Sequence, residues 1–149
     1  MSFHLHHVSL TVGDLPAAMA FFTKAFGFHA DFVEEDMGPD IARMAGHAGL
    51  LCAFTQMRAP GLDMVLELIC FHDAAGPAPQ GDALPWRPGA GHICFHVDDL
   101  EKALDTCRAA GAELLGEVIG FPGGRCCYLR SPGGAFVELE WIDPAEQTP

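Results

Sequence analysis

The chain has 149 residues, of which 50% are hydrophobic and 19% are charged, so its composition is that of a globular protein rather than a disordered one. Eight lysines and arginines against 20 aspartates and glutamates give a formal net charge of -12. This argues against nucleic acid or an anionic membrane as a partner, because both attract basic surfaces. No apolar run approaches the ~20 residues needed to cross a bilayer. No signal peptide is evident either, so a cytoplasmic location is expected.

The first half of the chain begins with a predicted strand and helix. Alternation of polar and apolar residues predicts a strand over 6–12. Asp14 suits the N-cap of a helix whose apolar residues recur at helical spacing up to Phe26, and Gly27 ends it. Because such a stripe is typical of a protein core, its phenylalanines are assigned no function.

Two or three further strands are expected over about 28–33, 50–56 and 64–71, the last with the strongest pattern. Between the first two, residues 34–49 show no clear period, and their acidic start at 34–36 is interpreted as a solvated loop. The first module therefore ends as a run of strands.

The middle of the chain is rich in residues that break regular structure. Residues 73–91 contain four glycines and four prolines, which predicts a linker at about 73–90. The chain, 1–149, is expected to be one domain made of a first module at about 5–72 and a second at about 91–142. Trp86, in the linker, has two interpretations. It lines a pocket, or it packs against a neighbouring module or subunit.

The second half repeats the plan of the first. The segment HVSLTVGDL at 7–15 returns as HICFHVDDL at 92–100, and each copy reads as a strand that begins with His and leads into an Asp N-cap. The remaining predicted elements of this half are a strand over 91–97, a helix over 100–110 capped by Asp98 or Asp99, strands near 113–118, 125–130 and 135–142, and a turn at Ser131-Pro132-Gly133-Gly134. We therefore expect an α+β fold of two βαβββ modules that form a curled sheet cup with the helices outside.

Strand alternation selects four residues that could carry chemistry. Glu67 and Glu138 each lie between aliphatic residues in a strand, and His7 and His92 oppose the apolar faces of their strands. A carboxylate is costly to bury unless it is paired or bound to a cation. Two imidazoles and two carboxylates suit one divalent transition metal: Zn, Ni, Fe, Mn or Co. All four residues are therefore predicted to point into one cavity and to bind one metal there.

The recurrence of the pattern supports this prediction more than any single residue does. A lone strand His is usually a satisfied core or surface residue, but here a His and a later Glu occur in each half. His96 shares a face with His92 but lies about 13 Å along the strand. It is interpreted as a pocket residue or as incidental. His6 has the opposite parity from His7, which makes His7 the favoured ligand.

The six cysteines form no Cys-x-x-Cys pair. They are interpreted as buried thiols in a reducing compartment, with a zinc–thiolate site as the alternative.

With these segments the chain resembles the vicinal oxygen chelate superfamily, the group of glyoxalases, bleomycin-resistance proteins and extradiol dioxygenases. The resemblance covers nearly the whole chain and rests on four segments: HVxLxVxDL at 7–15, LEL at 66–68, GHIxFxVxDL at 91–100 and SPxGxxVEL at 131–139. It implies the two-module fold and a metal frame on which the superfamily carries out several chemistries.

The resemblance also ranks the possible reactions. Dioxygenases of the group use two His and one Glu, whereas Glu67 here completes a His-Glu-His-Glu set like that of glyoxalase I. Methylmalonyl-CoA epimerase is similar but typically carries Gln at the position of Glu67. The set implies a metal-dependent lyase or isomerase that acts on a small carbonyl substrate through an enediolate. Glu138 is the favoured proton carrier and Glu67 the other candidate. An extradiol-type dioxygenase and a non-catalytic binding or resistance protein are the alternatives.

The substrate pocket departs from the glyoxalase I pattern. That enzyme contacts glutathione through an Arg and an Asn where this chain has Thr11 and Phe71. Arg125, Arg43 or Arg58 would have to supply such contacts instead. The expected partner is a small molecule. The high apolar content and the habit of the family predict a homodimer, with the cup formed either within one chain or across the dimer.

Overall fold

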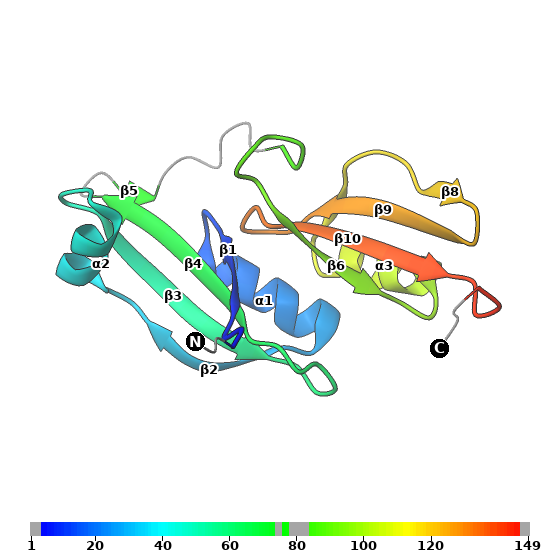
Figure 1. Ribbon diagram of the computed structural model, residues 1–149, viewed down its shortest axis with the longest axis horizontal. Coiled ribbons are helices and arrows are strands. Elements are labelled where there is room, and N and C mark those ends of the chain that lie inside the picture. Colours follow the sequence, from blue (N-terminus) through cyan, green and yellow to red (C-terminus); the bar gives the residue numbers. More distant parts are fainter. Residues whose placement is uncertain (1–3, 74–75, 78–83, 147–149) are drawn as a thin grey trace.

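The computed structural model describes residues 4–73, 76–77 and 84–146. Two curled, mixed sheets lie side by side along the long axis of the molecule, and α-helices cover one face of each sheet (Figure 1). This confirms the predicted α+β architecture. The predicted linker at 73–90 includes residues 74–75 and 78–83, which lie outside the described residues. No helix in the described part of the chain has the length and apolar character needed to span a membrane.

The first sheet has the strand order β1-β4-β3-β2, and β5 pairs with the far end of β4. The elements of this module are β1 (Val8–Thr11), α1 (Leu15–Phe26), β2 (His29–Glu34), α2 (Gly38–Ala45), β3 (Leu51–Arg58), β4 (Leu66–Asp73) and β5 (Gly76–Pro77). β1 runs parallel to β4, and the other pairs are antiparallel. The parallel pair thus brings the beginning of the module beside its last long strand.

The second sheet has the matching order β6-β10-β9-β7, and β8 also pairs with β9. Its elements are β6 (His92–His96), α3 (Leu100–Ala109), β7 (Glu113–Leu114), β8 (Ile119–Phe121), β9 (Gly124–Arg130) and β10 (Phe136–Ile142). β6 runs parallel to β10, as β1 does to β4. The two halves therefore share one topology, with β1, β3 and β4 equivalent to β6, β9 and β10.

Side-chain caps set where the two long helices begin. The Asp14 carboxylate accepts a hydrogen bond from the Ala17 amide at 2.9 Å, and Gly27 ends α1 in a left-handed conformation, with φ 71°. Asp99 accepts from the Lys102 amide at 3.0 Å. Of the two predicted caps for α3, Asp99 is therefore the one used.

One helix was not predicted, and one predicted strand differs in the structure. Residues 34–49 contain α2, whose only buried residues are Gly38 and Ile41, so there was no apolar stripe to reveal it. The predicted strand at 113–118 breaks after β7 and resumes as β8. The intervening Leu115 keeps one ladder contact by donating its amide hydrogen to the Tyr128 carbonyl at 3.0 Å.

Aromatic packing and a tight turn join the two modules. The Phe26 ring at the end of α1 stacks on the Phe95 ring of β6, with ring centroids 4.0 Å apart. The Gly13 amide donates to the Gly133 carbonyl at 2.8 Å. A Cβ atom at Gly133 would lie 2.6 Å from the Asp14 carbonyl oxygen, and φ there is 87°, so this contact requires glycine.

Candidate metal and proton-transfer site

Strand alternation places both candidate carboxylates on the open faces of their sheets. Leu66 and Leu68 are fully buried, while Glu67 between them faces the other side with 12% of its side chain exposed. Val137 and Leu139 are likewise buried beside Glu138 in β10, whose side chain is 17% exposed. The predicted orientation of these strands is therefore confirmed, and each carboxylate lies opposite the helix-covered face.

The first module brings His7 and Glu67 together. The His7 Nε2 atom lies 3.7 Å from the Glu67 Oε1 atom. The amide of Gln56, the cross-strand neighbour of Glu67 in β3, donates to the other carboxylate oxygen at 3.3 Å. His6 and His7 approach through their Nδ1 atoms at 2.8 Å. We call His7 and Glu67 the first half-site. Its histidine has a partner for the ring nitrogen that faces away from the carboxylate.

The second module repeats the pair with His92 and Glu138. The His92 Nε2 atom lies 3.1 Å from the Glu138 Oε2 atom. Tyr128 of β9 is the cross-strand neighbour of Glu138 and hydrogen-bonds to its carboxylate. The Tyr128 ring also meets the His92 ring edge-on, with centroids 5.0 Å apart. We call His92 and Glu138 the second half-site.

Three proton donors beside Glu138 have raised pKa values. Desolvation, followed by the negative charge of Glu138, raises the pKa of the Tyr128 phenol. The same two causes raise the pKa of the Cys94 thiol to about 11, with a further contribution from Glu140, and raise the pKa of the Cys126 thiol. At neutral pH all three groups therefore keep their protons and can donate hydrogen bonds to the Glu138 carboxylate.

The cysteine prediction holds for only part of the set. Cys52, Cys70, Cys107 and Cys127 are buried, and all six cysteines are free thiols. Cys94 is exposed and Cys126 is partly exposed. Side chains alternate between the two faces of the sheet along β6 and β9, which places both thiols on the open face beside Glu138. They are therefore not part of the core.

The donor atoms of each half-site are spaced as neighbouring ligands of one metal would be. Nitrogen and oxygen ligands lie about 2.0–2.2 Å from a transition metal, which puts neighbouring donors roughly 3.0–3.4 Å apart. The distances of 3.1 and 3.7 Å are close to this. Within the described residues, however, no group of three or more His, Cys, Asp or Glu is assembled. The structure therefore joins the four predicted ligands as two pairs.

The structure also places the arginines considered for substrate binding. Arg43 pairs with Asp40 at 3.4 Å, and Arg58 pairs with Asp31 at 2.8 Å. Arg125 pairs with Glu101 of α3. All three thus have carboxylate partners outside the half-sites.

Tyr128 and Gln56 are site residues that the sequence interpretation missed. A signal for Tyr128 was present, because the turn at 131–134 fixes the register of the β9–β10 hairpin. The Ser131 amide donates to the Ala135 carbonyl at 2.8 Å, and counting outward from that pair puts Tyr128 opposite Glu138. Alternation along the strand predicted which face of the sheet Glu138 occupies, but it did not predict which residue lies beside Glu138 on the next strand.

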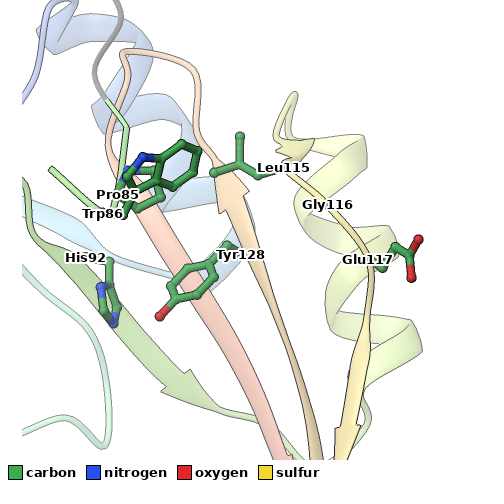
Figure 2. Close-up of a pocket in the computed structure, with 7 residues that line it drawn as sticks. All are labelled: Pro85, Trp86, His92, Leu115, Gly116, Glu117 and Tyr128. Carbon is green, nitrogen blue, oxygen red and sulfur yellow. The ribbon is translucent and has the colours of Figure 1, made fainter.

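A cavity of about 370 Å³ opens beside the second half-site (Figure 2). The residues that line it are Pro85, Trp86, His92, Leu115, Gly116, Glu117 and Tyr128. Trp86, which had two interpretations, thus lines a pocket, and 73% of the residue is exposed. The cavity places an apolar space next to the imidazole of the second half-site.

Comparisons with known proteins identify the family of the chain. The sequence profile of the Glyoxalase/Bleomycin resistance protein/Dioxygenase superfamily matches residues 4–139. An ethylmalonyl-CoA/methylmalonyl-CoA epimerase of Cereibacter sphaeroides is 28% identical, with 93% of this chain and 97% of the relative covered. A 2-epi-5-epi-valiolone epimerase of an Actinomyces species is 31% identical, with coverage of 91% and 77%.

Solved structures share the fold. A glyoxalase family protein from Bacillus cereus superposes with a TM-score of 0.77 at 23% identity, with 96% of each chain covered. The fosfomycin resistance protein FosX from Listeria monocytogenes, solved with Mn(II) and a dihydroxypropylphosphonic acid, superposes with a TM-score of 0.61 at 17% identity over 93% and 90% of the two chains. By its sequence match and its two-module fold, the chain belongs to the Glyoxalase/Bleomycin resistance protein/Dioxygenase superfamily.

Proposed function

We propose that this protein is a metal-dependent isomerase of the glyoxalase type, which moves a proton at a carbon next to a carbonyl group. The observation that carries the proposal is the repeated half-site, a His–Glu pair at equivalent positions in both modules. A carboxylate held beside the reacting carbon can accept such a proton and return it.

The names of the relatives support an isomerase over a lyase. Both curated relatives are described as epimerases, and FosX was solved with a divalent metal. Epimerisation removes a proton from one face of a carbon and returns one to the other face. Two carboxylates, Glu67 and Glu138, provide a group for each face.

We further propose that His7, Glu67, His92 and Glu138 together hold one divalent transition metal. When bound, the metal would supply a Lewis acid for the negative charge that develops on the substrate oxygens. The metals that suit these donors are Zn, Ni, Fe, Mn and Co.

The residues of the chain would perform the proton transfer. Loss of the proton turns the substrate into an enolate, or into an enediolate where the reacting carbon carries a hydroxyl, and Glu138 is the proposed carrier because the cavity adjoins its half-site. Tyr128 would orient Glu138 through its hydroxyl, and Gln56 would do the same for Glu67 through its amide. Glu67 then stands as the carrier for the opposite face.

We propose that a second copy of the chain completes the site. The described residues of one chain assemble only pairs of ligands. β1, which follows His7, and β6, which begins with His92, each pair on one side only among the described strands. A first half-site of one chain and a second half-site of another would make a four-ligand centre, and a two-fold dimer would contain two of them.

Mixing two inactive variants tests this assembly. His7→Ala and His92→Ala each damage every site of their own homodimer. A mixed dimer would keep one intact site if the half-sites meet across the dimer, so a refolded equimolar mixture should recover about a quarter of wild-type activity. A mixture that stays inactive while the mixed dimer is present would show that the site forms within one chain.

Solvent exchange tests the reaction. The protein, reconstituted with each of the five metals, is incubated in D₂O with methylmalonyl-CoA or with a cyclic hydroxyketone, and deuterium at the carbon beside the carbonyl is followed by mass spectrometry. We expect metal-dependent exchange that Glu138→Gln abolishes without unfolding. Exchange that is absent with every metal, or unchanged in Glu138→Gln, would refute the proposal. Oxygen uptake in place of exchange would indicate the dioxygenase alternative.

A further inference from the structure

The cavity beside the second half-site has an apolar end and a polar end. Trp86, Pro85 and Leu115 form the apolar end, whereas the Tyr128 hydroxyl and the His92 ring form the polar end (Figure 2). The Glu117 carboxylate points away from the other lining side chains. A ligand in this space would thus have apolar walls on one side and the half-site on the other.

The charge of the lining limits what can bind there. Of the described residues that line the cavity, none is lysine or arginine, and the whole chain carries a net charge of -12. Phosphate and carboxylate groups are bound in proteins mainly by such cations or by helix N-termini. The lining provides neither, so an anionic group is unfavourable in this space.

The size and shape of the cavity suit a ring. An apolar cavity of roughly 150 Å³ holds benzene, and this cavity has about 370 Å³. Trp86 offers a flat indole surface with 73% of the residue exposed. Stacking on such a surface favours a flat partner, because aromatic faces gain most from a parallel, offset contact.

We propose that this cavity binds a flat, uncharged ring of the substrate against Trp86, with the oxygens of the ring directed at His92 and Tyr128. The inference rests on the proposed function for the identity of the reacting atoms, but not for the binding of the ring. It names the substrate class as a ring-bearing carbonyl compound without a phosphate or carboxylate on the ring.

Gly116 allows the cavity to be filled without disturbing the fold. A Cβ atom built at Gly116 meets no atom within 4 Å, and the residue lines the cavity. Gly120 in β8 has equally open surroundings but does not line it. Gly116→Leu should therefore block the ring, and Gly120→Leu is the matched control.

The chain has two tryptophans, Trp86 and Trp141 in β10. Once Trp141 is replaced, tryptophan fluorescence therefore reports on Trp86 alone. The probes are 2-naphthol and 2-naphthyl phosphate, titrated into chelator-treated Trp141→Phe protein. We expect 2-naphthol to quench the remaining indole and to bind about tenfold more tightly than the phosphate. Gly116→Leu in this background should weaken 2-naphthol about tenfold, and Gly120→Leu should not. Calorimetry on Trp86→Ala should show a similar loss.

Equal affinity for the two probes, or unchanged 2-naphthol binding in both Gly116→Leu and Trp86→Ala, would overturn the inference. Binding is measured without metal or turnover, so its failure is separate from failure of the proposed reaction. Deuterium exchange without ring binding would remove this inference alone. Ring binding without exchange would leave it standing and remove the proposed isomerase.

Discussion

The two half-sites occupy equivalent positions in equivalent sheets, yet their surroundings differ. Across the hairpin, Glu67 receives the Gln56 amide, whereas Glu138 receives the Tyr128 hydroxyl. Only the second half-site contributes a residue, His92, to the lining of the cavity beside Trp86. The His–Glu pair is thus common to both halves of the internal repeat, whereas its neighbours differ. The two half-sites therefore differ in their hydrogen-bond partners and in their access to the cavity, although their His–Glu pairs match.

The parallel neighbours show the same divergence. Ser9 lies beside Glu67, and Cys94 lies beside Glu138, at matching register. Thiol and phenol donors surround Glu138, while a hydroxyl and an amide lie near Glu67. If the half-sites were interchangeable, equivalent substitutions would have equal effects.

Replacing each carboxylate with its amide should give the largest difference between the half-sites. We expect Glu138→Gln to lower the deuterium exchange rate by about 10²- to 10⁴-fold, because an amide cannot carry the proton. Glu67→Gln should lower the exchange rate only about tenfold, because Glu138 can still remove the proton from its own face and an amide oxygen can still bind the metal, but it should stop the return of a proton to the opposite face. Elemental analysis and circular dichroism would check metal content and folding. The reverse order would assign proton transfer to the first module.

Removing the neighbour of each carboxylate should have a smaller effect. Tyr128→Phe deletes a hydrogen bond to a charged group and is expected to lower kcat/KM about tenfold. Gln56→Leu deletes a longer contact of 3.3 Å, so about a threefold loss is expected. Steady-state kinetics with matched metal content would compare them. Equal losses in the two variants would contradict the asymmetry.

The exposed thiol of the second half-site should give the smallest effect on activity. Cys94→Ser is expected to keep turnover within about threefold of wild type, because a hydroxyl can replace the thiol as a donor. Since the pKa of Cys94 is raised to about 11, its thiolate is scarce at neutral pH. Alkylation of Cys94 should therefore be slow at pH 7.5 and accelerate about tenfold per pH unit up to pH 10.

Mass spectrometry of the alkylated peptides would measure this rate in metal-free protein. Cys107 serves as the control, because burial raises its pKa to about 11 as well but also shields it from the reagent. It should be labelled only on unfolding. Rapid labelling of Cys94 at pH 7.5 would show that Glu138 and its surroundings do not hold the thiol protonated.

Local patterns predicted most of the strands and both long helices because each has an apolar face whose period can be counted. They failed at α2, where Ile41 is the one large buried side chain. They also gave the correct face for Glu67 and Glu138, since alternation within a strand is a local property.

Local patterns of this kind could not predict that the two half-sites are separate. It depends on how one sheet is placed against the other, and that placement is set by contacts such as the stack of Phe26 on Phe95. No periodicity in either strand or helix encodes a contact between residues 69 positions apart. The sequence could thus indicate which face of its strand each candidate residue occupies, but not that the four candidates lie as two separate His–Glu pairs.

The contact between Gly13 and Gly133 has a consequence for folding. It joins residues 120 positions apart, and closing so long a loop before either module has formed carries a high entropic cost. Each module would therefore fold first, and docking of the turn onto the start of α1 would come last. Until Gly133 docks, a newly folded module is free to meet the complementary module of another chain. A side chain at Gly133 would hinder this docking step, because its Cβ atom would lie 2.6 Å from the Asp14 carbonyl oxygen, and would therefore favour association between chains over docking within one chain.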